Sequence, residues 1–146
     1  MSAPLYTAAI LRLATAIPHH VRLAAPQATA ERRSPVCGSR VTVDVSIGDD
    51  GRVAELGQAV NACALGQASA ALMGAHAIGR SPDELAAARD ALAAFLAGRR
   101  DDPGDWPGLD IFRAALPHSA RHPSIRLAFE AVAEAAAQAH QGRAAA

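Results

Sequence analysis

The two cysteines are the residues best suited to chemistry. Cys37 lies in the stretch SPVCGSR, residues 34–40, where Gly38 lets the backbone turn or approach a ligand closely. Cys63 lies where a strand-like pattern gives way to a helical one, which predicts a sulfur near a helix N-terminus, whose N–H groups and dipole stabilise a thiolate. Both positions suit a reactive or metal-binding sulfur. The alternative is that each thiol is a small buried apolar group, as free cysteines usually are.

No other group of side chains indicates catalysis. Asp83 and Glu84 belong to a predicted helix cap, and the aspartates of residues 101–105 lie in a turn-rich stretch. The sequence has no phosphate-binding glycine loop, no strained nucleophile turn and no run of aromatic residues for stacking. We therefore expect a protein that is not an enzyme of the hydrolytic or nucleotide-driven kind.

Composition limits the class of protein. With 146 residues, of which 51% are hydrophobic, residues 1–146 fit a single domain with a core of its own. Fourteen basic residues balance fourteen acidic ones, so neither nucleic acid nor a membrane is an expected partner. Residues 1–20 lack a basic leader and Arg12 interrupts their apolar run, which predicts neither a signal peptide nor a membrane span. We expect a cytoplasmic protein with free thiols.

The first half of the chain predicts a helix and a small antiparallel sheet. Residues 6–16 suit a helix that ends before Pro18, and residues 29–36 suit a short exposed strand. In residues 40–47 apolar and polar side chains alternate, which predicts one buried face and one solvent-facing face. The turn GDDG, residues 48–51, then leads into a further strand, which makes a meander.

The second half changes to a helical period. A helix is expected from Ala64 towards Gly79, and Ser81 with Pro82 and Glu84 forms a strong start for the next one. Residues 124–137 place apolar side chains on one face of a closing helix. The predicted fold class is α+β: an N-terminal helix, a three-stranded antiparallel sheet and several packed helices.

The surroundings of the two cysteines resemble a known family. The match is to the iron-sulfur cluster assembly scaffolds of the IscU, SufU and NifU N-terminal type, whose motifs read NPxCGD and GCAxSxASxSxM followed by GK. The matching positions are Pro35, Cys37 and Gly38 in the first motif, and Cys63, Ala64, Ala68, Ser69, Met73 and Gly79 in the second. The resemblance covers most of the chain and implies the SufE/NifU-like fold.

The chain departs from the family at two of the implied ligands. The aspartate of the first motif is Ser39, and the family's third cysteine, which opens the last helix, falls on Ser124. At two positions where the second motif has serine, this chain has Gly66 and Ala71. The family pattern implies three cysteines and one aspartate around a cluster or zinc ion, whereas hydroxyls are weak donors. A tight four-coordinate site within one subunit is therefore not expected.

Other groups are candidates to complete the ligation. His122 is the best-placed imidazole and His118 the next, although a solvated loop histidine is the plainer interpretation of His122. Two subunits of a homodimer could instead share a cluster, each giving two thiolates. Ser124 is more simply a helix N-cap than a ligand. Arg121 could contact an anionic sulfur, a cluster or a partner's carboxylate, or be a solvated surface charge.

Three functions follow from the resemblance. The first is a scaffold or carrier in which Cys37 and Cys63 hold iron, sulfur or a transient iron-sulfur cluster, with a cysteine desulfurase and cluster-accepting proteins as partners. The second is a degenerate paralogue that binds the desulfurase or zinc as an interaction module, with no tightly bound cofactor. The third is a persulfide relay, in which Cys63 accepts sulfur as the better-activated thiol.

Overall fold

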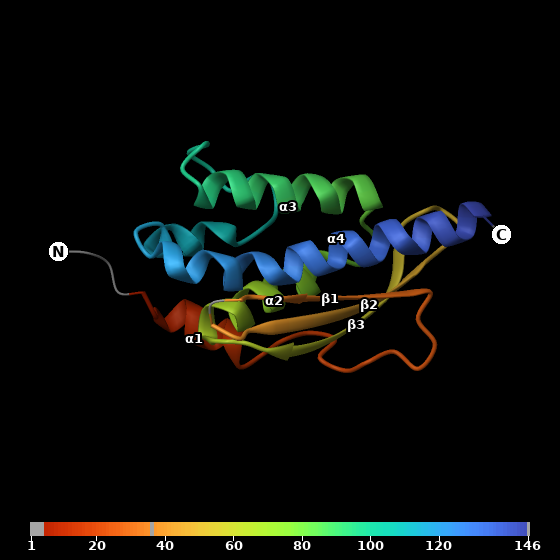
Figure 1. Cartoon of the computed structure of the whole chain (residues 1–146), viewed down its shortest axis with the longest axis horizontal. Coiled ribbons are helices and arrows are strands. Elements are labelled where there is room, and N and C mark those ends of the chain that lie inside the picture. Colours follow the sequence, from red (N-terminus) through yellow and green to blue (C-terminus); the bar gives the residue numbers. More distant parts are fainter. Residues whose placement is uncertain (1–4, 36, 146) are drawn as a thin grey trace.

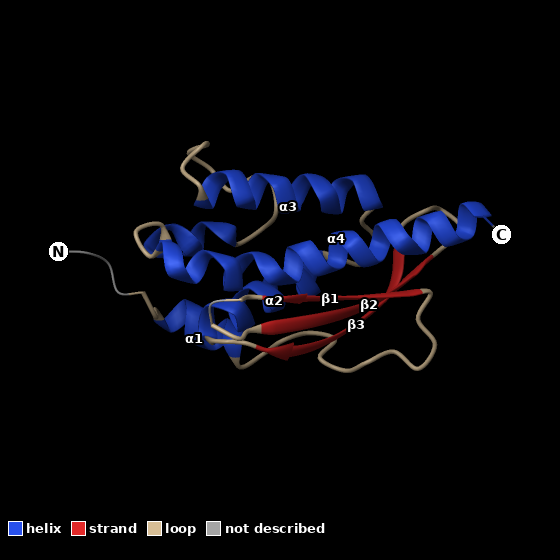
Figure 2. Cartoon of the chain, viewed as in Figure 1, coloured by secondary structure: helices blue, strands red, loops and turns tan. Residues whose placement is uncertain are grey.

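A three-stranded sheet forms one side of the protein and helices cover one of its faces (Figure 1, Figure 2). The computed structural model describes residues 5–35 and 37–145. The elements in chain order are α1 (Ala8–Ala14), β1 (Ala28–Arg33), β2 (Arg40–Ile47), β3 (Val53–Asn61), α2 (Ala64–His76), α3 (Pro82–Leu96), the 3-10 helices η1 (Leu109–Ala115) and η2 (Ser119–Arg121), and α4 (His122–Ala145). This order confirms the predicted α+β class.

The sheet is the predicted antiparallel meander, with strand order β1-β2-β3. Arg33 pairs with Arg40, and Arg40 pairs with Asn61, so these three residues mark one end of the sheet. The valines of β2 face α4 and are fully buried. At the opposite end, the turn between β2 and β3 places Gly51 at φ 78°, a left-handed conformation that glycine adopts without strain.

The second face of β2 is buried as well, which corrects the prediction that it faces solvent. Asp44 is 0% exposed because the segment before β1 runs across this face (Figure 1). Arg22 binds the Asp44 carboxylate through Nε at 2.6 Å and Nη2 at 3.0 Å, and the backbone N–H of Leu23 donates to it at 3.0 Å. Gly57 makes the crossing possible, since a Cβ there would lie 2.5 Å from the Val21 carbonyl oxygen.

The helices pack in two layers on the valine face. α4 lies between the sheet and α3, and α2 packs against α4 beside the sheet (Figure 1). The Ser81 side chain accepts from the Glu84 N–H at 3.1 Å, which confirms the predicted start of α3. α4 runs beyond the predicted residues 124–137 at both ends. None of the helices in the described ranges has the length and apolar character needed to cross a membrane.

Replacing Asp44 with asparagine tests the ion pair below the sheet. Burial raises the pKa of Asp44, but hydrogen bonds from Arg22, Thr29 and the Leu23 N–H outweigh it and hold the pKa below the ordinary 3.8. The charged carboxylate therefore stabilises the fold above pH 3.8, and this stability is lost as the pH falls through the lower folded-state pKa. We expect Asp44→Asn to lower the free energy of unfolding at pH 7 by about 2 kcal/mol.

Urea unfolding of the wild type and of Asp44→Asn across the acid range measures this effect. The exposed Asp105 gives a matched control, Asp105→Asn, which should unfold like the wild type. The same acid dependence in Asp44→Asn and in the wild type would contradict the assignment.

Candidate functional site

Both cysteines leave the sheet at the same end. The loop of residues 34–39 joins Arg33 of β1 to Arg40 of β2, and β3 ends across from them at Asn61. Cys63 follows two residues later and is the N-cap residue of α2, at the position that the change of pattern predicted. The first turn of α4 reaches the same loop through Ser124. Three segments that are distant in sequence, the Cys37 loop, residues 61–64 and the first turn of α4, thus meet beside one end of the sheet.

Three side chains form a closed cluster around Cys37. The Cys37 sulfur lies 3.1 Å from the Ser39 Oγ and 2.9 Å from the Ser124 Oγ, and the two hydroxyl oxygens lie 3.1 Å apart. Ser39 and Ser124 are buried, whereas Cys37 is exposed. When the thiol is ionised, each hydroxyl has one proton to donate to the sulfur. We call Cys37, Ser39 and Ser124 the thiol-hydroxyl cluster.

The loop itself fixes the position of Cys37. The Ser34 N–H donates to the Ser39 carbonyl at 2.8 Å, and the Gly38 N–H donates to the Ser34 carbonyl at 3.2 Å. The Cys37 N–H points to the Ser34 Oγ at 3.5 Å, and Gly38 adopts φ +73°. The sequence did not single out Ser34, although a serine hydroxyl often accepts a hydrogen bond from a backbone N–H a few residues later in the chain.

The cluster changes the acidity of Cys37. Desolvation raises the pKa of this thiol, but hydrogen bonds from the Ser124, Ser34 and Ser39 side chains and from the Ser39 backbone outweigh it and lower the pKa to about 6. A thiol with that pKa is mostly thiolate at neutral pH, and the thiolate is the nucleophilic and metal-binding form. The lowered pKa makes Cys37 a candidate for the reactive thiol, in addition to Cys63, which the sequence favoured.

Cys63 lies in a more enclosed position. Its side chain is half-buried against the apolar core and caps no backbone N–H of α2, although its carbonyl accepts from the Gln67 N–H at 2.9 Å. Helix α2 passes so close to α4 at Gly66 that a Cβ on this residue would lie 3.2 Å from the Ser124 carbonyl oxygen. Gly66, where the family pattern has serine, allows the approach that brings α2 to the cluster.

Ser124 is not a helix N-cap, which corrects that prediction. Helix α4 begins at His122, so Ser124 lies inside the first turn. It is 0% exposed, and its hydroxyl is directed at Cys37 and Ser39. The N-cap interpretation failed because the helix starts two residues earlier than its apolar pattern does.

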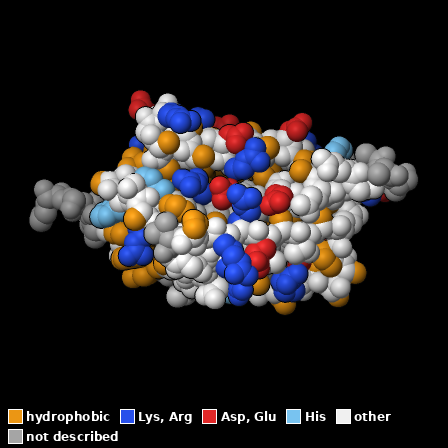
Figure 3. Space-filling model, in the orientation of Figure 1, with side chains coloured by type: hydrophobic (Ala, Val, Ile, Leu, Met, Phe, Trp, Pro, Cys, Tyr) orange, Lys and Arg blue, Asp and Glu red, His pale blue; other side chains and the backbone are white. Residues whose placement is uncertain are grey.

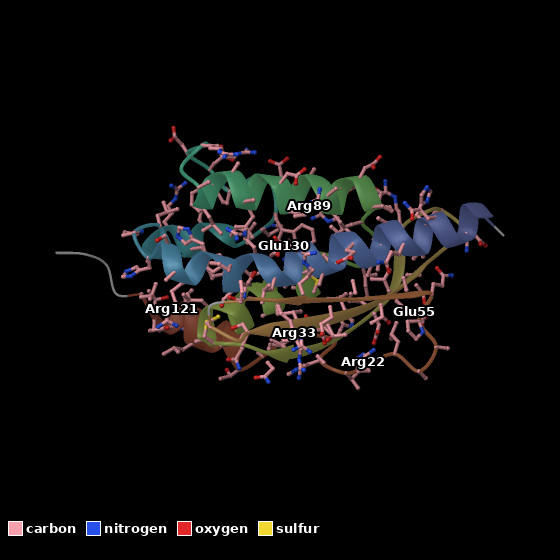
Figure 4. The ribbon with its side chains drawn as sticks, in the orientation of Figure 1. Arg22, Arg33, Glu55, Arg89, Arg121 and Glu130 are labelled. Carbon is pink, nitrogen blue, oxygen red and sulfur yellow. The ribbon has the colours of Figure 1, made fainter. Side chains whose placement is uncertain are left out.

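The remaining candidates lie around the start of α4. The His122 Nε2 is 2.8 Å from the Ala115 carbonyl, and because a carbonyl only accepts, Nε2 carries the proton and Nδ1 alone could bind a metal. His122 is buried rather than solvated, and His118 is exposed at the start of η2. Arg121 is half-buried at this end of the protein (Figure 4), and within residues 5–35 and 37–145 its guanidinium makes no hydrogen bond or ion pair.

Comparison with known proteins adds to this geometry. A scan against protein-family models and a search of the curated proteins each gave no match. The solved N-terminal domain of a NifU-like protein from Brucella abortus is 38% identical to this chain, with a TM-score of 0.88, over 94% of this chain and 95% of that one. The chain belongs to the NifU-like N-terminal family.

A second solved structure shares the fold of this NifU-like protein. It is the SufU protein of Fervidobacterium islandicum AW-1, named as an iron-sulfur cluster assembly scaffold for the SUF system. It is 19% identical, with a TM-score of 0.79, over 90% of this chain and 96% of that one. At this identity the likeness supports the fold alone.

The donor atoms decide what this NifU-like site can hold. Among the described residues, no three of the His, Cys, Asp and Glu side chains come together as a metal site. Two sulfurs, two hydroxyls and the Nδ1 of His122 are the candidate donors that the described residues bring to this end of the protein. Hydroxyls bind zinc and iron weakly, so this set gives no support to a resident four-coordinate zinc site. This donor set suits an iron ion or a cluster whose remaining ligands are supplied by another molecule.

The acidity of Cys37 can be measured by alkylation. In a Cys63→Ala background, the rate of reaction with iodoacetamide should rise with pH through a midpoint of about 6, because only the thiolate reacts. Ser124→Ala removes one hydrogen bond to the sulfur and should move the midpoint up by about one pH unit. Ser119→Ala, at an exposed serine of η2, should leave it unchanged. A wild-type midpoint near the ordinary value of about 8.5 would contradict the cluster's role.

Proposed function

We propose that this NifU-like protein is an iron-sulfur cluster assembly scaffold or carrier, with Cys37 and Cys63 as the residues that hold the cargo. The cargo is iron, sulfur or a transient cluster, and no enzymatic step is required of the chain. The observation that carries the proposal is the meeting of the Cys37 loop, the start of α2 and the first turn of α4 at one end of the sheet. An exposed thiol with a pKa of about 6 supports it.

With this set of donors the protein would bind its cargo weakly. Clusters of the common types take four thiolate ligands, and one chain supplies two. The others would come from a second copy, from a small thiol or from the acceptor protein. Within the same chain, the hydroxyls of Ser39 and Ser124 would be weak auxiliary donors, and the Nδ1 of His122 would be a stronger one. A cluster held by two strong ligands is easier to release than one held by four, which suits transfer.

Sulfur acceptance at Cys37 is a second candidate, favoured by the lowered pKa of this thiol and its exposure. The Cys37 thiolate would attack the outer sulfur of a persulfide on a cysteine desulfurase. A new sulfur-sulfur bond forms on Cys37 as the donor's bond breaks, and the donor cysteine leaves as a thiolate. The cluster hydroxyls would hold the attacking thiolate. Cys63 remains the alternative acceptor that the sequence predicted.

Anaerobic loading tests the scaffold. The protein would be incubated with ferrous iron, cysteine and a cysteine desulfurase, then desalted and assayed for iron and acid-labile sulfide. The wild type should retain both, and Cys37→Ala and Cys63→Ala should each lose most of them, because each removes one of two strong ligands. Ser119→Ala is the matched control and should behave as the wild type does.

Two further outcomes of this experiment distinguish the alternatives. Extra sulfur on Cys37 in the mass spectrum, without retained iron, would favour the sulfur acceptor. Equal iron and sulfide in the double variant Cys37→Ala/Cys63→Ala and in the wild type would overturn the scaffold, and a mass spectrum without extra sulfur on Cys37 would overturn the sulfur acceptor. Both results together would leave an interaction module.

Restoring a third thiolate should strengthen retention. The Ser124 Oγ already lies 2.9 Å from the Cys37 sulfur, so Ser124→Cys would add a strong donor within the cluster. We expect iron to be lost to a chelator several-fold more slowly from this variant than from the wild type. Ser119→Cys adds an exposed thiol outside the cluster and should give no gain. Equal rates for the two variants would contradict a ligand position at residue 124.

A further inference from the structure

The outer face of the sheet carries a group of arginines away from the helices. By strand register, Arg33 of β1, Arg40 of β2 and Asn61 of β3 share this face, followed by Glu31, Thr42 and Ala59 in the next row. Figure 4 labels Arg33 and Arg22 on the side of the strands away from α4, and Figure 3 shows arginine side chains, in blue, gathered over the sheet. We call Arg22, Arg33 and Arg40 the arginine face.

A hollow of about 440 Å³ opens on this face. Its lining includes Arg22, Arg40 and the Glu31 carboxylate, together with His20 and Asn61, whereas Arg33 lies outside the hollow. Among the described residues that line it there is no phenylalanine, tyrosine or tryptophan. A surface for single-stranded nucleic acid usually offers such rings for base stacking. The lining therefore favours a ligand recognised by charge and hydrogen bonds.

Ion pairs position the guanidinium groups but leave some of their N–H donors free. Arg22 is fixed by the buried Asp44, and Glu31 accepts from the Arg33 Nε at 2.9 Å and lies 3.8 Å from the Arg40 Nε. The three arginine side chains remain 52%, 66% and 44% exposed, in chain order. A guanidinium has five N–H donors, so donors remain free on each. Binding to such a fixed group loses little side-chain entropy.

The charge of this face is unbalanced although the whole chain is neutral. Asp44 is fully buried and its charge is offset by Arg22, and among the described residues Glu31 is the one carboxylate within ion-pair distance of Arg33 and Arg40. Residues 1–61, which include all three strands, contain six arginines and five acidic residues, and Asp49, Asp50 and Glu55 lie at the opposite end of the sheet from Arg33 and Arg40. The excess of positive charge is therefore local to the end of the sheet that carries Arg33 and Arg40, and this end complements an acidic segment.

The arginine face adjoins the thiol-hydroxyl cluster. Arg33 ends β1 and Arg40 begins β2, so these two residues flank both ends of the loop that carries Cys37. A chain bound across Arg33 and Arg40 would lie next to the exposed sulfur. A binding surface at this place serves a protein that exchanges material with Cys37.

We propose that the arginine face binds an acidic segment of the partner protein that exchanges sulfur or cluster with this chain. The identity of the partner rests on the proposed function, whereas the chemistry of recognition does not. Carboxylates on a flexible segment match the free N–H pairs of Arg33 and Arg40, since arginine binds a carboxylate through two parallel hydrogen bonds. The hollow is open and shared by several elements, which fits an extended segment.

A fluorescein-labelled octaglutamate peptide is the probe. Its fluorescence anisotropy would be titrated with the full-length protein at low salt. The double variant Arg33→Gln/Arg40→Gln should bind about tenfold more weakly, because two exposed ion pairs are lost. Arg22 is left in place, since its removal would leave Asp44 without its ionic partner. Arg99→Gln, at an exposed arginine after α3, is the matched control and should bind as the wild type does.

Several results would overturn the inference. One is equal affinity of the wild type and the double variant. A second is displacement of the peptide by inorganic phosphate at matched ionic strength, which would indicate a small-anion site. A third is tighter binding of an oligothymidine strand than of the peptide, which would indicate nucleic acid.

The same proteins separate this inference from the proposed function. Arg33→Gln/Arg40→Gln should retain iron and sulfide after chemical loading with ferrous iron and sulfide, because the cysteines are intact. Loading without peptide binding in the wild type would refute the arginine face alone. Arginine-dependent peptide binding without loading would refute the scaffold alone.

Discussion

The packing of α4 on the valine face of β2 is the constraint on which the site depends. Val41, Val43 and Val45 are fully buried on the face of β2 that α4 covers. This packing fixes the position of α4 along the strands and therefore the position of its first turn. As a result the Ser124 hydroxyl arrives beside Cys37, although 87 positions separate them in the chain. Burial of apolar surface thus sets the geometry of a polar cluster.

The cluster combines a reactive sulfur with weak ligands. Ser39 and Ser124 stand where the resemblance implies an aspartate and a cysteine, and each hydroxyl keeps a hydrogen bond to the Cys37 sulfur. A hydroxyl stabilises a thiolate by donating a hydrogen bond to it, whereas it adds little to metal binding. The same substitutions therefore favour an activated thiol over a closed metal site. Loose holding and ready transfer are the properties expected of a carrier with such a donor set.

Local patterns were sufficient to predict much of the fold. Alternation in residues 40–47 predicted β2, the Ser81 and Pro82 start predicted α3, and the change of period at Cys63 placed that residue at the start of α2. Long-range contacts were not predictable in the same way. The burial of Asp44 depends on a loop that crosses the sheet, and the role of Ser124 depends on how α4 docks. Both are polar residues whose partners lie far away in sequence, so no local period reveals them.

The central claim is that Cys37 and Cys63 bind the iron cargo together at one end of the sheet. X-ray absorption at the iron edge measures it most directly, on protein loaded anaerobically with ferrous iron and sulfide. The account predicts a shell of sulfur neighbours around iron in the wild type, with fewer sulfurs in Cys37→Ala and in Cys63→Ala. A shell of oxygen and nitrogen only in the wild type, or an unchanged sulfur shell in both variants, would contradict it.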